Sequence, residues 1–538
     1  MMSRISALAA AAVALTGAGS ALAQAPSDAP APHTPAVACE QLAQGALPAA
    51  RITLAEARPA GAFTIPGAAG GFGPSSMALP AFCRVAATLA PTPDSEIRME
   101  LWLPANWNGK FLMVGNGGWS GSISYSAMGE PLARGYAVAS TDTGHEGARG
   151  TFAFGHPEKL VDFAWRAVHE TTLDGKTLTA AYYGAGPRLS YWDGCSSGGR
   201  QGLKEVQMFP ADYDGVIAGA PANNWNRLQV QSMLASVSNN PKGRPPVLGG
   251  AQISLLHTAA LGQCDGLDGV VDGEIADPRA CRFRPSSLIC APGQALAACL
   301  SVEQEAVADR IYAPVRNPAT GELIYPGLEP GSELQWPVVI LRPWTIGIDT
   351  FGLAHGDPNW DQYGFDPVKD AALAEQTDIG VVAISTDLSA FKNRGGKLIQ
   401  YHGWADALIA PENSVNYYES VAARQGGLEP TEAFYRLFLV PGMGHCGGAY
   451  QLDWITALEQ WVEGGMAPAQ IVGKRQPPAN FAPPAQAAPT PPRDPGARPI
   501  CAYPLQAAYK GAGAAGDPAS FACRTGPRGP RTEDRPSA

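Results

Sequence analysis

Short apolar runs alternate with helix-length stretches along much of this 538-residue chain, and this rhythm constrains its fold more than any other feature. Helical stretches such as 160–183 and 199–209 separate several of the runs. Because parallel strands need a long crossover, usually a helix, the pattern predicts an α/β fold with a mostly parallel sheet covered on both faces. The strand-like runs lie at 97–103, 111–114, 136–139, 189–192, 216–218, 397–401 and 435–440.

The segment 223–387 breaks this rhythm. It holds four of the ten cysteines, a cluster of Asp and Gly, and many aromatic residues and prolines. We expect it to be an insertion between two late strands, folded as a lid domain. The predicted organisation is a signal peptide (1–23), the first part of the α/β core (24–222), the lid (223–387), the second part of the core (388–475), and a Pro-rich connector with a Cys-bounded C-terminal segment (476–538).

The N-terminus has the pattern of a secretory signal peptide. Arg4 precedes an Ala-rich apolar run, and the Ala-Leu-Ala triplet at 21–23 is a small-residue cleavage pattern, so we expect cleavage before Gln24. No later stretch approaches about 20 uninterrupted apolar residues, which predicts a protein without a membrane anchor. We therefore expect a secreted or periplasmic protein.

Charge and cysteine content narrow the class further. Lys and Arg number 38 against 48 for Asp and Glu, a net charge of −10, so no positive excess is available for phosphates, and we expect no nucleic-acid partner. In an oxidising compartment the even set of ten cysteines predicts five disulfides. The alternative, reduced thiols or a zinc cluster, lacks a C-x-x-C pair.

Gly194-Cys195-Ser196-Ser197-Gly198 fits the G-x-S-x-G pattern between an expected strand and an expected helix. The two glycines allow a sharp turn, which exposes the serine hydroxyl at the top of a sheet. The pentapeptide alone is a weak signal, but its strand-turn-helix context favours Ser196 as a nucleophile.

A serine nucleophile needs a histidine base and a carboxylate that orients the base. His445 and Asp406 each follow a late strand and are the leading candidates, and the order Ser, Asp, His is that of α/β-hydrolases. His145, His169 and His402 would break this order, and we interpret them as turn or surface residues.

Two cysteines flank these candidates: Cys195 precedes the serine and Cys446 follows the histidine. If nucleophile and base lie within hydrogen-bonding distance, their neighbours fall within disulfide range, which predicts a bridge between them. The other eight cysteines can pair in 105 ways. Short-range closure favours Cys264 with Cys281, Cys290 with Cys299 and Cys501 with Cys523, which leaves Cys39 with Cys83.

An ester hydrolase also needs backbone amides that stabilise the developing oxyanion. One should come from Ser197, directly after the nucleophile, and the other from the glycine-rich turn 115–118. Within that turn we choose Gly118 over Gly117, with little to separate them.

A second constellation runs from Cys264 to Glu274, with three aspartates separated by glycines. Such a loop gathers hard oxygen ligands of the kind that Ca²⁺ prefers, although the spacing is not that of an EF-hand. Since clustered carboxylates repel one another, we favour structural calcium over the alternative, a solvated acidic turn. The expected ligands are Asp265, Asp268 and Asp272, with the backbone carbonyls of Val270 and Glu274.

Taken together, these motifs resemble the tannase and feruloyl esterase family, which also includes a bacterial hydrolase of mono(2-hydroxyethyl) terephthalate. The resemblance implies a secreted serine esterase with an α/β-hydrolase core, a calcium-bearing lid and a disulfide between Cys195 and Cys446. It supports Ser196, Asp406 and His445 as the triad, and the five calcium ligands named above. The matching elements lie at 194–200, 264–274, 402–406, 442–446 and 498–523.

The expected activity is hydrolysis of small-molecule esters of aromatic carboxylic acids, such as galloyl or feruloyl esters, through an acyl-enzyme. One alternative is an esterase for other aromatic monoesters, including mono(2-hydroxyethyl) terephthalate. A second, from another class, is a non-catalytic, calcium-stabilised secreted binding protein.

Overall fold

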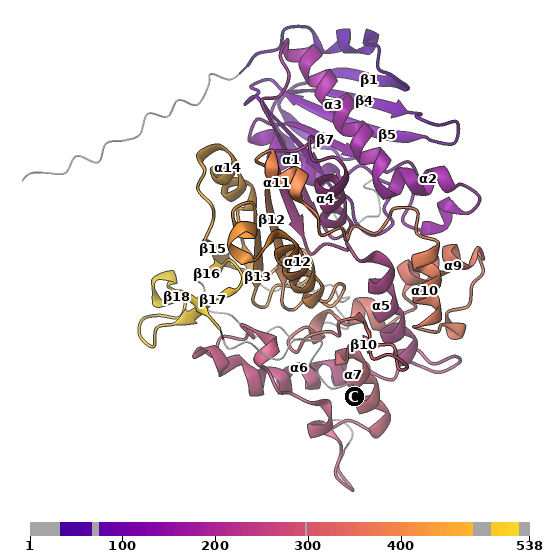
Figure 1. Ribbon diagram of the computed structural model, residues 1–538, viewed down its shortest axis with the longest axis vertical. Helices are drawn as coiled ribbons and strands as arrows, with labels where there is room; N and C mark the ends of the chain where they lie inside the picture. The colour runs from indigo at the N-terminus through magenta and orange to yellow at the C-terminus, as the bar shows by residue number, and fades with distance from the viewer. Residues whose placement is uncertain (1–32, 67–74, 296–297, 477–495, 527–538) are drawn as a thin grey trace, which may run out of the picture.

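A nine-stranded sheet forms the centre of the molecule (Figure 1). The computed structural model describes residues 33–66, 75–295, 298–476 and 496–526, so the expected signal peptide lies outside the described residues. In spatial order the strands are β1 (Ala50–Arg58), β4 (Phe82–Leu89), β5 (Ile97–Pro104), β7 (Ala137–Thr141), β6 (Lys110–Val114), β8 (Leu189–Cys195), β9 (Gly215–Gly219), β12 (Lys397–Gly403) and β13 (Tyr435–Val440).

All seven expected strand runs lie on strands of this sheet. From β7 to β13 every neighbouring pair is parallel, because each connection crosses over through a helix or a longer segment. The pairs β1–β4, β4–β5 and β5–β7 are antiparallel, which makes the sheet mixed. The first two strands of this edge, β1 and β4, lie before residue 97, where the expected strand runs begin.

Helices cover both faces of the sheet, as the alternation predicted. On one face α3 (Ala167–Tyr183), α4 (Ser197–Met208) and α12 (Glu412–Gln425) contribute to one hydrophobic core, and on the other α1 (Tyr125–Ala133) and α14 (Trp454–Gly464) contribute to a second. The expected helix 160–183 is divided into α2 (Pro157–Val161), a π-helical turn and α3.

Residues 220–396, between β9 and β12, are called the insertion below. This segment leaves the sheet after β9 and returns at β12, the strand that lies beside β9. β9 and β12 pair in parallel, with Gly215 opposite Lys397. Much of the insertion packs in one hydrophobic cluster, which includes Trp336 and Phe351 and also Trp119 and Phe163 from outside the insertion. The helices of the insertion are α5 (Trp225–Asn239), α6 (Gly250–Cys264), α7 (Val302–Tyr312), α8 (Pro337–Ile340), α9 (Thr345–His355), α10 (Lys369–Gln376) and α11 (Ser389–Asn393). In Figure 1 α6, α7, α9 and α10 lie away from the sheet, whereas α11 lies beside α4.

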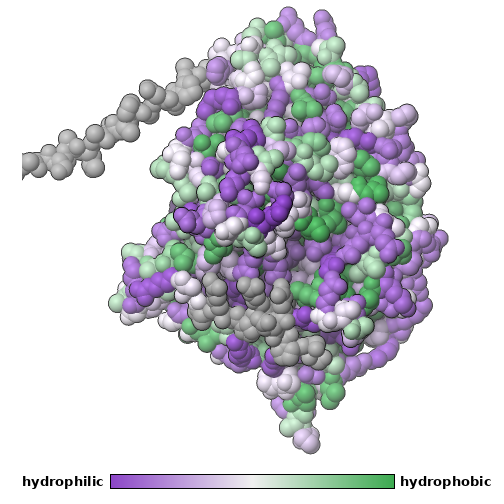
Figure 2. Space-filling model, viewed as in Figure 1, coloured by the Kyte–Doolittle hydropathy of each residue, from purple (hydrophilic) through white to green (hydrophobic). Residues whose placement is uncertain are grey.

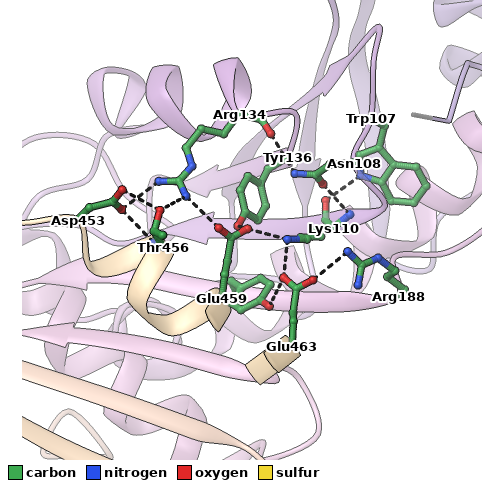
Figure 3. A network of polar contacts seen from close by, with 11 residues as sticks. Trp107, Asn108, Lys110, Arg134, Tyr136, Arg188, Asp453, Thr456, Glu459 and Glu463 are labelled. Atoms are coloured by element: carbon green, nitrogen blue, oxygen red, sulfur yellow. Dashed lines mark hydrogen bonds and ion pairs between the residues drawn. The ribbon is translucent and has the colours of Figure 1, made fainter. Parts of the chain in front are cut away.

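A polar network holds α14 against the sheet (Figure 3). Glu459 accepts from Lys110 Nζ at 2.6 Å and from Arg134 Nη2 at 2.9 Å. Glu463, one turn further along the helix, pairs with Lys110 and accepts from Tyr191 at 3.0 Å. Because Lys110 is only 12% exposed, these contacts are partly shielded from water, and we expect them to contribute to stability.

The C-terminal part of the chain, from Tyr450 onward, forms two small antiparallel sheets beside the core. Within 476–538, where a connector and a Cys-bounded segment were expected, the strand β16 begins at Ala497 and pairs with β15, while residues 477–495 lie outside the described residues. The strands are β14 (Tyr450–Gln451), β15 (Gln470–Arg475) and β16 (Ala497–Cys501) in one sheet, and β17 (Leu505–Tyr509) and β18 (Phe521–Thr525) in the other. Two further hairpins pair β2 (Gly61–Thr64) with β3 (Ser76–Leu79) and β10 (Val315–Arg316) with β11 (Leu323–Tyr325).

All ten cysteines are paired in five disulfides. The bridges are those favoured by short-range closure and by the flanking argument: Cys39–Cys83, Cys195–Cys446, Cys264–Cys281, Cys290–Cys299 and Cys501–Cys523.

Within the described ranges no helix has the length and apolar character needed to cross a membrane. On the face shown in Figure 2, hydrophilic and hydrophobic residues are interspersed.

Candidate active site

Ser196 lies at a tight turn between β8 and α4. Its backbone has φ 64° and ψ −122°, a conformation that non-glycine residues rarely adopt, and its amide donates to the Gly219 carbonyl at 2.9 Å. The turn needs small neighbours: a Cβ on Gly199 would lie 2.3 Å from the Gly219 oxygen. The sequence motif therefore forms the strained turn that exposes a serine hydroxyl.

Asp406 and His445 form a buried pair beyond the ends of β12 and β13. His445 Nδ1 lies 2.8 Å from Asp406 Oδ2, and Asp406 is fully buried. The other carboxylate oxygen accepts the amides of Leu408 and Ile409 at 2.8 and 3.0 Å. Burial alone raises the pKa of Asp406, but the adjacent His445 and the hydrogen bonds to the carboxylate outweigh burial and hold that pKa below its ordinary value. The carboxylate thus stays ionised and fixes the orientation of the imidazole.

The Cys195–Cys446 disulfide brings this pair to the serine. Its two Cα atoms are 5.8 Å apart, although the cysteines are separated by 251 residues in the chain. Ser196 and His445 are their immediate neighbours. Like Ser196, Cys446 has a positive φ, 63°, so both ends of the link have an uncommon backbone conformation.

The glycine-rich turn after β6 packs directly on the start of α4. The Gly118 carbonyl accepts the Ser197 hydroxyl at 2.9 Å, and the Asn116 carbonyl accepts the Gly198 amide at 2.7 Å. Gln201 accepts the Asn116 amide and donates to the Asn116 side chain, which locks the turn in place. The structure therefore places Gly118 and Ser197, the expected oxyanion-hole residues, side by side.

Two residues that sequence reasoning missed complete the surroundings of the pair. His402, interpreted as a turn or surface residue, is instead fully buried: its Nε2 lies 3.1 Å from Asp406 Oδ2, and its Nδ1 lies 2.7 Å from Ser414 Oγ. Gln335, from the insertion, accepts the His445 amide at 2.9 Å. The i, i+4 spacing of His402 and Asp406 was a weak signal for the first contact, whereas nothing local in the sequence points to the second.

The other two histidines set aside earlier also have defined partners. His145 lies in a bend after the turn at 143–144, as one half of its interpretation expected, but its ring is buried and lies 2.9 Å from the Trp119 carbonyl, so it is not a surface residue. His169 remains partly exposed and contacts Asp212. Neither residue replaces His445 as the partner of Asp406.

The insertion also approaches the glycine-rich turn. Trp119 Nε1 donates to the Ile346 carbonyl at 3.3 Å, and a Cβ on Gly118 would lie 3.3 Å from Ile346 Cδ1. Phe351, further along α9, is fully buried in the hydrophobic cluster of the insertion. Ile346 therefore lies against the glycine-rich turn.

The acidic loop 264–274 packs against the C-terminal segment. The Asp265 carboxylate accepts the amides of Asp272 and Gly273 at 3.0 and 2.9 Å. Arg498, which is 1% exposed, pairs with Asp268 and Asp272, and Arg475 pairs with Asp272. Sequence reasoning missed both arginines. Asp272 Oδ1 is buried without a hydrogen-bond donor among the described residues, and such oxygens suit a hard cation.

The mixed sheet with helices on both faces, the strained serine turn after β8, and the Asp–His pair after two later strands define the α/β-hydrolase class. Residues 83–524 match the family described as tannase and feruloyl esterase. The chain belongs to this family and is a carboxylic ester hydrolase.

Relatives of known name support this assignment. An uncharacterized esterase of Xanthomonas campestris is 37% identical, with 93% of each chain covered. A probable feruloyl esterase B-2 of Aspergillus terreus is also 37% identical, covering 82% of this chain and 86% of the relative. The crystal structure of feruloyl esterase B from Aspergillus oryzae has a TM-score of 0.82 at 32% identity and covers 90% of this chain and 99% of its own. Tannin acyl hydrolase from Aspergillus niger, at 22% identity and a TM-score of 0.75 over 94% of this chain and 98% of its own, shares the fold.

Proposed function

We propose that this enzyme hydrolyses esters of aromatic carboxylic acids with Ser196 as the nucleophile. The observation that carries the proposal is the buried Asp406–His445 hydrogen bond, joined to the serine turn by the Cys195–Cys446 bridge. Ser196 Oγ attacks the ester carbonyl carbon, and His445 Nε2 accepts the hydroxyl proton. Asp406 orients the ring and stabilises the imidazolium that forms.

The tetrahedral intermediate collapses when His445 returns the proton to the leaving alkoxide, which departs as an alcohol. Water then attacks the acyl-enzyme, His445 takes a proton from it, and the acid leaves as Ser196 regains its proton. The Ser197 and Gly118 amides are proposed to stabilise both oxyanions. Such donors each contribute about 3–4 kcal/mol in comparable enzymes.

The substrate class rests on the relatives, which are named for feruloyl and tannin esters. Side chains near the oxyanion turn are compatible with a planar acyl group, since Trp119 and Ile346 are apolar there. A panel of methyl ferulate, methyl gallate and mono(2-hydroxyethyl) terephthalate tests the assignment. We expect the highest kcat/KM on one of the first two. A clear preference for the terephthalate ester would refute the feruloyl or galloyl assignment.

The nucleophile is tested separately with a fluorophosphonate probe. We expect covalent labelling of the native enzyme at Ser196 and none in Ser196→Ala. Ser197→Ala is the matched control, because it removes the neighbouring hydroxyl and leaves its backbone amide in place. Labelling that persists in Ser196→Ala would refute the assignment of the nucleophile.

We also propose that Ca²⁺ binds the acidic loop through Asp265, Asp268 and Asp272 and the carbonyls of Val270 and Glu274. Bound calcium would stabilise the loop without taking part in the reaction. Chelation should lower the Tm, and added calcium should restore it. If chelation leaves the Tm unchanged and no calcium co-purifies, Arg475 and Arg498 suffice to neutralise the loop and the proposal fails.

We infer further that the protein is exported. Five disulfides persist in oxidising compartments and are consistent with an extracellular enzyme. N-terminal sequencing of the native mature protein should begin at Gln24. Recovery of the intact N-terminus from the native host would contradict cleavage.

A further inference from the structure

A cluster of metal-ligating side chains lies at the far end of α4 from the serine. His169 on α3, Glu205 on α4 and Asp212 in the turn before β9 each direct a ligand atom to one place, and these atoms all lie within 4.8 Å of one another. Glu205 lies nine residues after Ser196, about 13 Å along the helix at 1.5 Å per residue. The cluster is therefore separate from the catalytic groups.

Glu205 is the unusual member of the cluster. Its side chain is almost completely buried, with 1% exposure of the residue, and neither carboxylate oxygen has a hydrogen-bond donor. A buried carboxylate without a partner is costly, so it either binds a proton or is paired with a cation. With no donor on either oxygen, the Glu205 carboxylate lacks the positive charge that its burial calls for.

The nearby cations do not meet this need. Lys176 donates to the backbone carbonyl of Asp212, and Arg394 donates to the carbonyl of Tyr213 at 2.5 Å. Within the described part of the chain, neither side chain is bonded to the carboxylate of Glu205 or of Asp212. Among the described residues, the Glu205 carboxylate therefore has no cationic side chain bonded to it.

His169 is held in a position suited to ligation. Its ring stacks on Phe209, with centroids 3.8 Å apart and planes inclined by 14°, and its Nδ1 lies 2.8 Å from Asp212 Oδ2. The side chain is 20% exposed, so solvent has access to this edge of the cluster. One imidazole and two carboxylates, with an open side for water, form a donor set that suits Zn²⁺ and similar ions.

We propose that His169, Glu205 and Asp212 bind one divalent transition-metal ion of the zinc type. The ion would link α3, α4 and the turn before β9, and it would neutralise the buried Glu205. The role of the ion is structural, because all three ligands lie near the end of α4 that is remote from the serine turn.

The test uses the full mature enzyme, stripped with a chelator and then kept in millimolar Ca²⁺ so that the acidic loop is supplied separately. Zn²⁺ is titrated by equilibrium dialysis, and Co²⁺ by its visible absorption, which reports ligand geometry. We expect one saturable equivalent per chain and a higher Tm with Zn²⁺. Absence of saturable binding would overturn the proposal.

Two variants and a matched control locate the site. Glu205→Gln and His169→Asn should each weaken Zn²⁺ binding by at least about tenfold. His156→Asn is the control, because His156 Nδ1 also lies 2.8 Å from an aspartate, Asp94, on the exposed surface. Equal Zn²⁺ affinity in all three variants would overturn the assignment. If Glu205→Gln fails to fold, the partly exposed His169→Asn decides the question alone.

Discussion

Gln335 offers the sharpest test of how the insertion supports His445, the proposed general base. Its side chain reaches from the insertion to the His445 amide, 110 residues away in the chain, and it is only 4% exposed. It also fills the space beside Gly444, where a Cβ would lie 1.4 Å from Gln335 Nε2. We predict that Gln335 positions the imidazole for proton transfer without touching the reacting atoms.

Replacing Gln335 with Ala would leave the buried His445 amide without its acceptor. An unsatisfied buried amide costs about 1–3 kcal/mol. If the whole cost falls on the geometry of the transition state, kcat decreases by about 5- to 150-fold. KM should change little, because the amide holds the base and not the substrate. Gln335→Met should behave like the alanine variant, since it fills the space but lacks the acceptor.

The assay is steady-state kinetics on methyl ferulate, with Tm measured on the same samples. Gln304→Ala is the matched control: its side chain accepts the Ser301 amide at 3.0 Å and caps α7, away from the active site. It should lower the Tm and leave kcat unchanged. The reasoning fails if Gln335→Met retains native kcat, or if Gln335→Ala loses stability without loss of kcat.

Three further predictions concern the bridge, pH and the polar network. Replacing both Cys195 and Cys446 by Ser opens a disulfide loop of 251 residues, which stabilises the fold by up to about 5 kcal/mol. Replacing Cys290 and Cys299 opens a loop of 9 residues, worth about 3 kcal/mol. The Cys195/Cys446 variant should therefore show the larger loss of Tm, and only this variant should show a large loss of activity. Burial raises the pKa of Asp142 to about 7, so the folded state holds this proton more tightly than the unfolded state does. The proton therefore adds at most about 4 kcal/mol to the free energy of unfolding at low pH, and this contribution is lost as pH rises through 7. Asp142→Asn should therefore gain stability relative to the native enzyme between pH 5 and pH 8 in thermal melts, and parallel pH profiles would contradict this. Lys110→Met leaves Glu459 and Glu463 short of a cation and should cost about 1–3 kcal/mol in urea unfolding, whereas Lys242→Met, at an exposed pair, should cost less than about 1 kcal/mol.

The features that depend on local sequence were predictable. Each strand run was visible as apolar residues ended by turn formers, and the serine turn was visible because small residues must stand on both sides of Ser196. The histidines were harder. His402 lies near the end of β12 and His445 follows β13, and only the fold shows that both reach Asp406.

The sequence by itself determined the fold class and the order of the candidate triad, and it favoured the cysteine pairing that the structure has, because adjacent residues and strand ends carry that information. Only the tertiary structure decided which distant groups meet: Gln335 at His445, Arg498 at the acidic loop, and His169 with Glu205 and Asp212. These contacts join residues that are far apart in the chain. Asp268 and Arg498 are separated by 230 residues, and His169 and Asp212 by 43. Such contacts depend on how helices and strands pack in space, and no local propensity or spacing encodes that packing.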